Sequence, residues 1–150
     1  MSYRHGFHAG NHADVLKHTA LVALLRILAR KDKPLLVVDT HAGAGMYSLE
    51  QGFAVRNAEF RGGIGALWER SDLPESVTDY LDQVRAVNPD GVLRQYPGSP
   101  RIALGVLRPQ DRLRLFELHS TEGAILARQF AQEGRRVTVT AGDGFAGLKA

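Results

Sequence analysis

The stretch LLVVDTHAGAG, residues 35–45, decides the fold class. It opens with four apolar residues that lead into Asp39, and two glycines one residue apart follow at Gly43 and Gly45. A continuous apolar run of this kind is typical of a strand in a parallel sheet that is covered on both faces. Glycines directly after such a strand let the backbone approach a ligand closely. The stretch therefore predicts a central strand of an α/β sheet with a ligand crevice at its carboxyl end.

A helix is predicted on the amino-terminal side of this strand. Asn11 is a favourable N-cap, and Asp14 places a negative charge in the first turn, where the helix dipole stabilises it. Apolar residues then recur at intervals of three and four as far as Ala29, and Pro34 disfavours a helical conformation for Lys33. We expect a helix that is buried on most of its sides, and a second helix directly after the glycine turn.

The rest of the chain divides into an insertion and a continuation of the sheet. Residues 50–96 carry helical patterns, no strand pattern, and a closing NPDG turn, which together predict a small helical insertion. Two more strands are predicted, LRLFEL at 113–118 and RVTVTAGDG at 136–144. The predicted layout is 1–49 for the first helix, first strand and glycine turn, 50–96 for the insertion, and 97–150 for the second and third strands.

Each predicted strand ends in an acid, namely Asp39, Glu117 and Asp143. The carboxyl ends of parallel strands border one crevice, so these side chains should converge there. Carboxylates repel phosphates and suit a ligand with hydroxyls, amines and a positive centre, such as S-adenosylmethionine. Glu117 could accept both ribose hydroxyls, and Asp143 could accept from the adenine amine. Taken singly, each acid is as readily explained as a helix cap, a turn former or a solvated strand end.

Two other glycine-rich sites are disfavoured. A dinucleotide fingerprint needs Gly or Ala three positions after its second glycine, and this chain has Ser48 there. A phosphate-binding P-loop needs Gly-Lys-Ser/Thr, which is absent from the sequence. The pattern therefore favours a nucleoside-type ligand over a dinucleotide or a nucleoside triphosphate.

The histidines cluster near the amino terminus, where four of the six fall within the first eighteen residues. His8 and His12 have the spacing of two metal ligands on a helix, but the N-cap between them argues that they do not share a face. A histidine metal protein is thus an alternative hypothesis, and no metal is expected. His18 lies on the apolar stripe, as core histidines do, and His41 lies inside the glycine turn. Both are candidate contacts of a bound cofactor.

Bulk composition limits the class of protein. The chain has 150 residues, 44% of them hydrophobic, which suits one globular domain. Its formal net charge of +3 permits a polyanionic partner, and the lack of cysteine fits a reducing cytoplasm. The longest nearly apolar run, residues 19–29, contains Arg26 and is too short to span a bilayer. A cytoplasmic protein without membrane contact is expected.

Five segments together resemble one family. They are SYRHGFHAGNHADVLKH at 2–18, DTHAGAG at 39–45, YPGSP at 96–100, FELH at 116–119 and AGDGF at 141–145. In this order they resemble the bacterial ribosomal RNA large subunit methyltransferase J family. The resemblance implies a Rossmann-like class I methyltransferase fold with a helical subdomain inserted after the first strand. It implies methyl transfer from S-adenosylmethionine to the exocyclic amine of one adenosine in 23S ribosomal RNA, free or partly assembled, by a monomeric enzyme.

The resemblance also implies roles for individual residues. Those implied to contact the cofactor are His18, His41, Ser99, Glu117, Asp143 and Gly144, with Gly43 and Gly45 forming the turn. Tyr3 and Arg4 are implied to reach toward the RNA. Phosphate contacts are also expected from basic residues that could equally be solvated surface charges: Lys17, Arg56, Arg61 and Arg70.

One motif of related adenine amine methyltransferases is missing. These enzymes hold the flipped base with an Asp-Pro-Pro-Tyr type motif, and this sequence contains none. A fourth strand beside residues 35–39 is also lacking, which would leave an open sheet edge that favours self-association. We therefore expect residues 1–150 to be the amino-terminal, cofactor-binding part of a longer enzyme, inactive alone, with its catalytic Asp beyond Ala150. The alternative is a non-catalytic nucleoside- or RNA-binding module.

Overall fold

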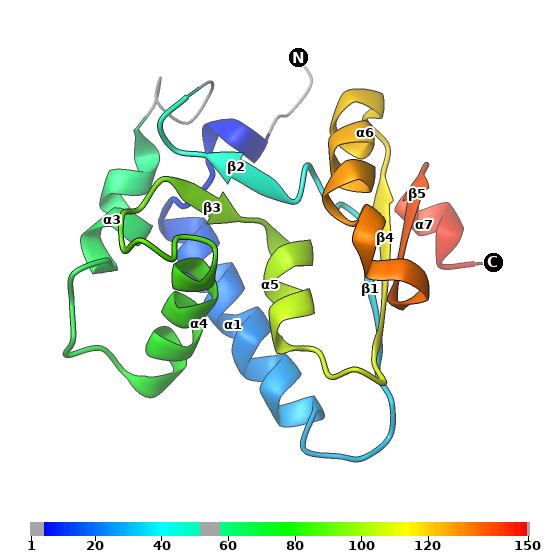
Figure 1. Ribbon diagram of the computed structural model, residues 1–150, viewed down its shortest axis with the longest axis horizontal. Coiled ribbons are helices and arrows are strands. Elements are labelled where there is room, and N and C mark those ends of the chain that lie inside the picture. The colour runs from blue at the N-terminus through cyan, green and yellow to red at the C-terminus, as the bar shows by residue number, and fades with distance from the viewer. Residues whose placement is uncertain (1–4, 52–57, 150) are drawn as a thin grey trace. The chain divides into compact units, whose positions relative to one another are not determined.

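The computed structural model describes residues 5–51 and 58–149 (Figure 1). By its internal contacts the chain forms two compact units, one of residues 1–24 and 47–97 and the other of residues 25–46 and 98–150. The helices are α1 (His12–Leu28), α3 (Ile64–Leu67), α4 (Glu75–Ala86), α5 (Ser99–Val106), α6 (Ser120–Gln129) and α7 (Gly144–Gly147), with 3-10 turns at η1 (His5–Phe7), η2 (Glu59–Gly62) and η3 (Ala131–Arg136). The strands are β1 (Leu36–Asp39), β2 (Met46–Ser48), β3 (Gln95–Pro97), β4 (Arg112–Glu117) and β5 (Val137–Ala141).

The unit of residues 25–46 and 98–150 contains a parallel sheet in the order β1-β4-β5. Strand β4 alternates, so that Leu113 and Leu115 are buried on one face while Arg112 and Arg114 are exposed on the other. Helix α5 packs against β1 and β4, and α6 packs against β4 and β5. The predicted fold class, an α/β fold of the Rossmann-like type, is confirmed.

Strand β1 is not the central strand of the sheet that the structure describes. It pairs with β4, which is the middle strand, and Leu36 at its start is 55% exposed. The neighbour predicted for its other edge is not among the described residues. The open edge agrees with the expectation that residues 1–150 lack the fourth strand beside residues 35–39, and whether β1 is central in a larger sheet stays a prediction.

Helix α1 follows the predicted start but is less buried than predicted. The Asn11 side chain accepts a hydrogen bond from the Asp14 N–H at 2.9 Å, as expected of an N-cap. Along the helix, however, Leu16 is 75% exposed and Leu24 is 54% exposed. The prediction of burial on most sides was therefore wrong. Intervals of three and four locate the buried face around His18, but they do not set its width.

The other unit holds two strands that the sequence reading missed. Strands β2 and β3 form a two-stranded sheet, and beside them the Leu49 N–H donates to the Arg94 carbonyl at 2.8 Å. The helix expected after the glycine turn is thus a strand, and residues 50–96 are not free of strand. Each strand has three residues, too few for alternation to be visible, and is anchored by a buried tyrosine, Tyr47 in β2 and Tyr96 in β3. Helix α4 forms as predicted.

The amino-terminal segment of this unit packs closely on the glycines that precede α3. A Cβ added to Gly63 would lie 2.1 Å from the carbonyl oxygen of Gly10, so no other residue fits there. The Glu59 carboxylate accepts from the Asn11 amide at 3.0 Å and lies 2.9 Å from His8 Nδ1. His8 therefore has a structural partner. In residues 5–51 and 58–149 no group of three or more His, Asp or Glu side chains is placed to hold a metal ion.

Within the same described ranges, none of the helices has both the length and the apolar character needed to cross a membrane.

Candidate functional site

The glycine turn after β1 has two residues in left-handed backbone conformations, Gly43 with φ 64° and Gly45 with φ 82°. Residues other than glycine rarely adopt these φ angles. A Cβ on Gly45 would also lie 3.0 Å from Leu126 Cδ1 and 3.2 Å from the Phe130 ring. The packing of α6 and the residue that follows it thus accounts for Gly45, whether or not a ligand approaches the turn.

Glu117 fastens this turn to the end of β4. Its Oε2 accepts from the Gly43 N–H at 2.7 Å, and its Oε1 accepts from the His119 N–H at 2.7 Å. The backbone supports the same junction, because the Ala42 N–H donates to the Phe116 carbonyl at 3.0 Å. Each carboxylate oxygen has more than one lone-pair site. Glu117 can therefore hold the turn and still accept hydrogen bonds from a ligand.

Asp39, at the end of β1, joins the turn to the start of α5. Its Oδ2 accepts from the Ser99 hydroxyl at 2.6 Å, and its Oδ1 accepts from the His41 N–H at 3.0 Å. The residue that precedes α5 in the N-cap position is Gly98, and Ser99 is the first helical residue. Ser99 therefore does not occupy the N-cap position, and its hydroxyl instead donates to the carboxylate at the end of β1.

Asp143 and Gly144 form the end of β5 and the start of α7. The Asp143 Oδ1 caps this helix by accepting from the Phe145 N–H at 2.9 Å. A Cβ on Gly144 would lie 2.4 Å from the carbonyl oxygen of Thr40, so the backbone of α7 touches the end of β1. The His41 ring meets Phe145 edge-on, with ring centroids 5.2 Å apart.

Seven of the eight predicted cofactor residues therefore gather in one unit, at the carboxyl ends of β1, β4 and β5. They are His41, Gly43, Gly45, Ser99, Glu117, Asp143 and Gly144. Their contacts with a cofactor remain a prediction, whereas their proximity follows from the contacts described above. The strand ends present carboxylate oxygens, which accept hydrogen bonds, and the glycine turn lets a ligand approach the backbone closely. Such a site suits a ligand with hydroxyls, amines and a cationic centre.

The eighth residue, His18, belongs to the other unit and is buried there. Its Nδ1 lies 2.8 Å from the Tyr96 hydroxyl, which in turn lies 2.9 Å from the Tyr80 hydroxyl. Burial raises the pKa of both tyrosines well above the usual value, so both stay protonated and serve as hydrogen-bonding groups. Within its own unit His18 has a structural role, and its contact with a cofactor stays a prediction.

The predicted RNA contacts fare differently from one another. Tyr3, Arg4 and Arg56 lie outside the described residues. Lys17 forms an ion pair with the buried Asp14 at 2.8 Å. Arg70 forms a bidentate ion pair with Asp72, with hydrogen bonds of 2.9 and 2.8 Å. Arg61 is exposed. Lys17 and Arg70 are thus already partly neutralised by carboxylates.

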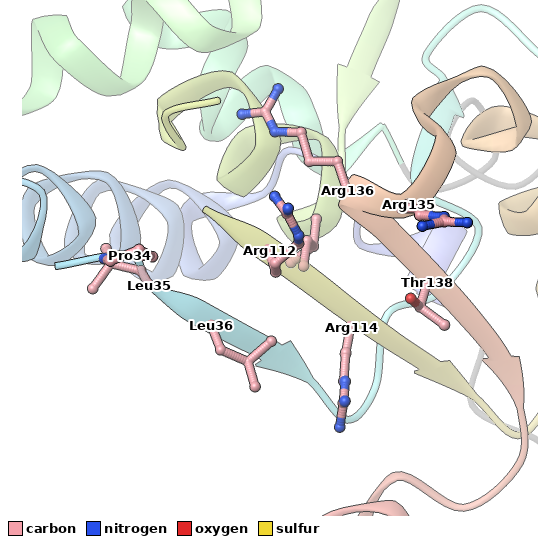
Figure 2. Close-up of a pocket in the computed structure, with 9 residues that line it drawn as sticks. Pro34, Leu35, Leu36, Arg112, Arg114, Arg135, Arg136 and Thr138 are labelled. Carbon is pink, nitrogen blue, oxygen red and sulfur yellow. The ribbon is translucent and has the colours of Figure 1, made fainter. Parts of the chain in front are cut away.

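A hollow of about 400 Å³ lies at the opposite, amino-terminal ends of the strands, and none of the described residues that line it is acidic. Its arginines are Arg112, Arg114, Arg135 and Arg136. Figure 2 shows the guanidinium groups of Arg114 and Arg136 pointing away from each other, and Arg136 donates to the carbonyls of Leu107 and Arg108. The arginines do not converge on one point, so this hollow is not the candidate site.

Sequence reasoning recognised Asp39 as a strand-end acid but missed its partner. Ser99 lies 60 positions further along the chain, and no local pattern joins the two residues. It also missed Asp111, which is buried and accepts a hydrogen bond from the Leu35 N–H at the entry to β1. A bonded Arg108 lowers the pKa of Asp111 to about 2. A short Pro-Gln-Asp turn is the only signal for it in the sequence.

A parallel sheet with acids at its carboxyl ends and a glycine turn after its first strand defines the class of Rossmann-like α/β proteins. Residues 32–150 match the family described as ribosomal RNA large subunit methyltransferase D, RlmJ. The chain belongs to this family, as the five sequence segments predicted.

Two relatives carry the name ribosomal RNA large subunit methyltransferase J. The one from Escherichia coli K12 is 49% identical over 150 residues, and the one from Haemophilus influenzae is 44% identical over 151 residues. Each alignment takes in 100% of this chain and 53% of the relative. The crystal structure of protein LPL1258 from Legionella pneumophila superposes with a TM-score of 0.84 at 40% identity, covering 93% of this chain and 51% of that one. The chain spans about half the length of the curated relatives it matches.

Proposed function

We propose that the protein takes part in methyl transfer from S-adenosylmethionine to the exocyclic amine of an adenosine in 23S ribosomal RNA. In this proposal residues 1–150 supply the cofactor site, with 1–49 and 97–150 forming the methyltransferase domain and 50–96 an inserted subdomain. The observation that carries it is the junction at Glu117, whose carboxylate holds the glycine turn at 2.7 Å and keeps lone pairs for a ligand. Family membership supports methyl transfer to ribosomal RNA, and the sequence resemblance suggests the cofactor, the adenosine amine and 23S RNA.

The chemistry of the donor set fits the cofactor. S-adenosylmethionine carries ribose hydroxyls, an adenine amine, an α-ammonium group and a sulfonium, all of which are donors or cationic. Glu117 and Asp143 would accept from the ribose and the adenine amine, and the turn at Gly43 and Gly45 would lie against the amino-acid end. When bound, the cofactor supplies an electrophilic methyl group on a positively charged sulfur.

In this scheme the chain's own residues bind the cofactor and hold it in position. Asp39 and Glu117 fix the glycine turn from two sides, at the ends of β1 and β4, so the site is formed before a ligand arrives. The His41 and Phe145 rings stand at its edge and would exclude water from one side. The adenine amine of the RNA is a weak nucleophile, and the proposed reaction needs its base flipped out of the helix. The sequence has no Asp-Pro-Pro-Tyr motif to hold such a base, so we expect residues 1–150 to bind cofactor without transferring methyl groups.

Charge supports an RNA partner for the unit that holds the crevice. Residues 25–46 and 98–150 carry twelve Lys and Arg against seven Asp and Glu, a formal charge of +5, whereas the other unit carries −2. A net positive unit attracts a polyanion at long range even though its crevice is acidic. We propose 23S ribosomal RNA in the cytoplasm as the partner, with binding that weakens as salt is raised.

Isothermal titration tests the cofactor site. We expect S-adenosylmethionine and S-adenosylhomocysteine to bind the protein, and Glu117→Gln to weaken both by about tenfold or more, since a charged acceptor is lost. Glu75→Gln, at an exposed position in α4, is the matched control and should leave binding unchanged. The absence of heat with either ligand, in protein whose melting curve shows it folded, rules the proposal out.

A second candidate is a non-catalytic nucleoside- or RNA-binding module, favoured by the missing base-holding motif. A methyl-transfer assay with radiolabelled cofactor and 23S RNA separates the two, with the Escherichia coli relative as the positive control. Incorporation by this chain alone supports an enzyme that is complete in these residues. Cofactor binding without incorporation supports the cofactor-binding part of an enzyme, and RNA binding without cofactor binding supports the module.

A further inference from the structure

The charges of the unit that holds the crevice are separated along its strands. Beside the amino-terminal ends of β1, β4 and β5 lie three segments that form the basic end, residues 30–33, 108–114 and 135–136. These segments carry eight Lys and Arg against two acids, a formal charge of +6. The rest of the unit carries four basic and five acidic residues, a charge of −1, and includes the three strand-end acids of the crevice. The unit therefore has a basic pole and an acidic pole.

The basic end is one continuous surface, because hydrogen bonds join its three segments. Arg108 donates to the carbonyls of Lys31 and Lys33 at 2.6 and 2.9 Å. Arg136 donates to the Arg108 carbonyl at 3.1 Å. Of the two acids, Asp111 is buried and neutralises Arg108 alone, and Asp32 is exposed. Most of the positive charge is thus left uncompensated at the surface.

Three arginines of the basic end are exposed without a carboxylate partner. Arg112 and Arg114 stand on the exposed face of β4, and Arg135 is exposed just before β5. Among residues 5–51 and 58–149, no acidic side chain forms an ion pair with any of the three; Glu133, close to Arg135 in sequence, pairs instead with Arg101 at 3.8 Å. The hydrogen bonds of Arg112 reach only carbonyls, at 3.2–3.4 Å, which do not neutralise its charge.

The spread of these arginines suits a row of phosphates better than a single one. Figure 2 shows the guanidinium groups of Arg112 and Arg114 pointing in different directions, although both side chains start from β4. One phosphate needs donors that converge, whereas a nucleic acid backbone presents separate phosphates along a surface. Thr138, paired in register with Arg114, adds a hydroxyl donor. A membrane surface is disfavoured, because Leu36 is the one large hydrophobic side chain among the described residues lining the hollow that is mostly exposed.

We propose that the basic end binds the phosphate backbone of the ribosomal RNA, at a place separate from the crevice. The inference rests on the proposed function, which supplies the RNA. Arg112 and Glu117 stand at opposite ends of β4, about 17 Å apart along the strand. Because the acidic pole repels phosphates and the basic end attracts them, the RNA backbone is held at one end of the strands. The crevice at the other end stays open to the cofactor and to a flipped base.

Fluorescence anisotropy with a fluorescein-labelled RNA hairpin, which has an adenosine in its loop, tests this surface over a series of KCl concentrations. Arg114→Gln combined with Arg135→Gln should weaken binding about tenfold or more at about 0.1 M KCl. The slope of log affinity against log salt should flatten by about two, one for each lost phosphate contact. Arg114→Lys combined with Arg135→Lys keeps both charges and should keep the slope.

The matched control is Arg128→Gln combined with Lys149→Gln, which removes two exposed charges of the same unit outside the basic end. It should weaken binding by less than about twofold, since distant exposed charges are screened by salt. Equal losses in the arginine pair and in the control mean that only overall charge attracts the RNA, and this overturns the inference. Binding to phosphatidylglycerol vesicles that the arginine pair abolishes, with RNA binding unchanged, assigns the surface to a membrane and overturns it too.

Calorimetry with S-adenosylhomocysteine separates this inference from the proposed function. The arginine pair should bind this ligand as the wild type does, because the substitutions lie at the opposite ends of the strands. Wild-type protein that binds the ligand but not the hairpin refutes the inference and leaves the cofactor site standing. RNA binding that depends on the arginines, in protein that does not bind the ligand, supports the basic end and refutes the cofactor site. If the double variant does not fold, the single variants decide the matter, each with a slope flattened by about one.

Discussion

Replacing Asp111 with Asn should destabilise the unit that holds the crevice. Asp111 is fully buried and accepts four hydrogen bonds, two on each oxygen. Oδ1 accepts from the Leu35 N–H at 2.8 Å and the Arg108 Nη2 at 3.0 Å, and Oδ2 accepts from the Arg108 N–H at 2.8 Å and its Nε at 3.0 Å. Arg108 also donates to the carbonyls of Ala29, Lys31 and Lys33. The pair thus ties the loop after α1 and the entry to β1 to the turn before β4.

The size of the effect follows from the count of acceptors. An asparagine keeps one acceptor oxygen, so two of the four donors lose their partner whichever way the amide turns. A buried donor without a partner costs about 1–3 kcal/mol, so the expected loss is about 3 kcal/mol. For a chain of this size 1 kcal/mol corresponds to about 3 °C, and Asp111→Asn should melt about 9 °C lower at pH 7. Thermal melting followed by circular dichroism measures this shift.

The same carboxylate gives the effect a pH dependence. The bonded Arg108 lowers the pKa of Asp111 to about 2 in the folded protein, against about 3.9 for an unfolded aspartate. The unfolded chain therefore takes up the proton first as the pH falls, and protonation favours unfolding. The contribution of Asp111 should be complete above about pH 5 and be lost as the pH falls through 2, so that wild type and Asp111→Asn converge below about pH 2.

A matched control is Asp72→Asn, which removes an exposed carboxylate that also pairs with an arginine, Arg70. Exposed pairs contribute little, so this variant should melt with the wild type. The reasoning is refuted if Asp111→Asn melts within about 1 °C of wild type at pH 7, where about 9 °C is expected. A gap between the two curves that stays constant from pH 5 to pH 2 would refute the electrostatic part alone.

Three further predictions concern packing and buried hydrogen bonds. Gly45→Ala should lower the melting temperature more than Gly91→Ala. Both residues have left-handed φ angles, 82° and 78°, but only Gly45 faces Leu126 and Phe130, whereas the space around Gly91 is open. Equal melting temperatures would mean that backbone strain is the whole effect. Gly144→Ala should weaken S-adenosylhomocysteine binding measured by calorimetry and lower the melting temperature, because its Cβ would lie 2.4 Å from the Thr40 carbonyl oxygen. The control Gly142→Ala, whose Cβ would have nothing within 4 Å, should fold normally. Normal folding and binding by both variants would contradict the close approach of α7 to the end of β1. Tyr96→Phe removes the hydrogen bonds to His18 and Tyr80 and should cost about 2 kcal/mol in urea denaturation, about twice the loss in Tyr80→Phe, which removes one of them; identical losses would mean that the bond to His18 contributes nothing.

Much of the candidate site could be predicted because one topological rule constrains it. The apolar run at β1 and the alternation at β4 and β5 predict strands, and the acids at their ends are visible in the printed sequence. Once the strands are parallel, their carboxyl ends must lie at one edge, so Asp39, Glu117 and Asp143 are brought together by geometry alone. The N-cap at Asn11 was predictable for a similar reason, since a cap and its helix are adjacent in the chain.

Other features depend on residues that meet only after folding. The bond between Ser99 and Asp39, 60 positions earlier, has no signal in the sequence. Gly45 was read as a ligand contact, and its missing side chain makes room for Leu126 and Phe130. Strands β2 and β3 have three residues each, so their pairing, rather than any periodicity, reveals them.

The linear order of residues was enough for the fold class, the strand-end acids and the family, because apolar periodicity and short motifs are local properties of the chain. The folded arrangement alone settled which donor each carboxylate binds, which glycine is needed for packing, and that β4 rather than β1 is the middle strand of the described sheet. A hydrogen bond or a tight contact requires two groups within about 3–4 Å, and residues far apart in sequence reach that distance only through the packing of whole elements.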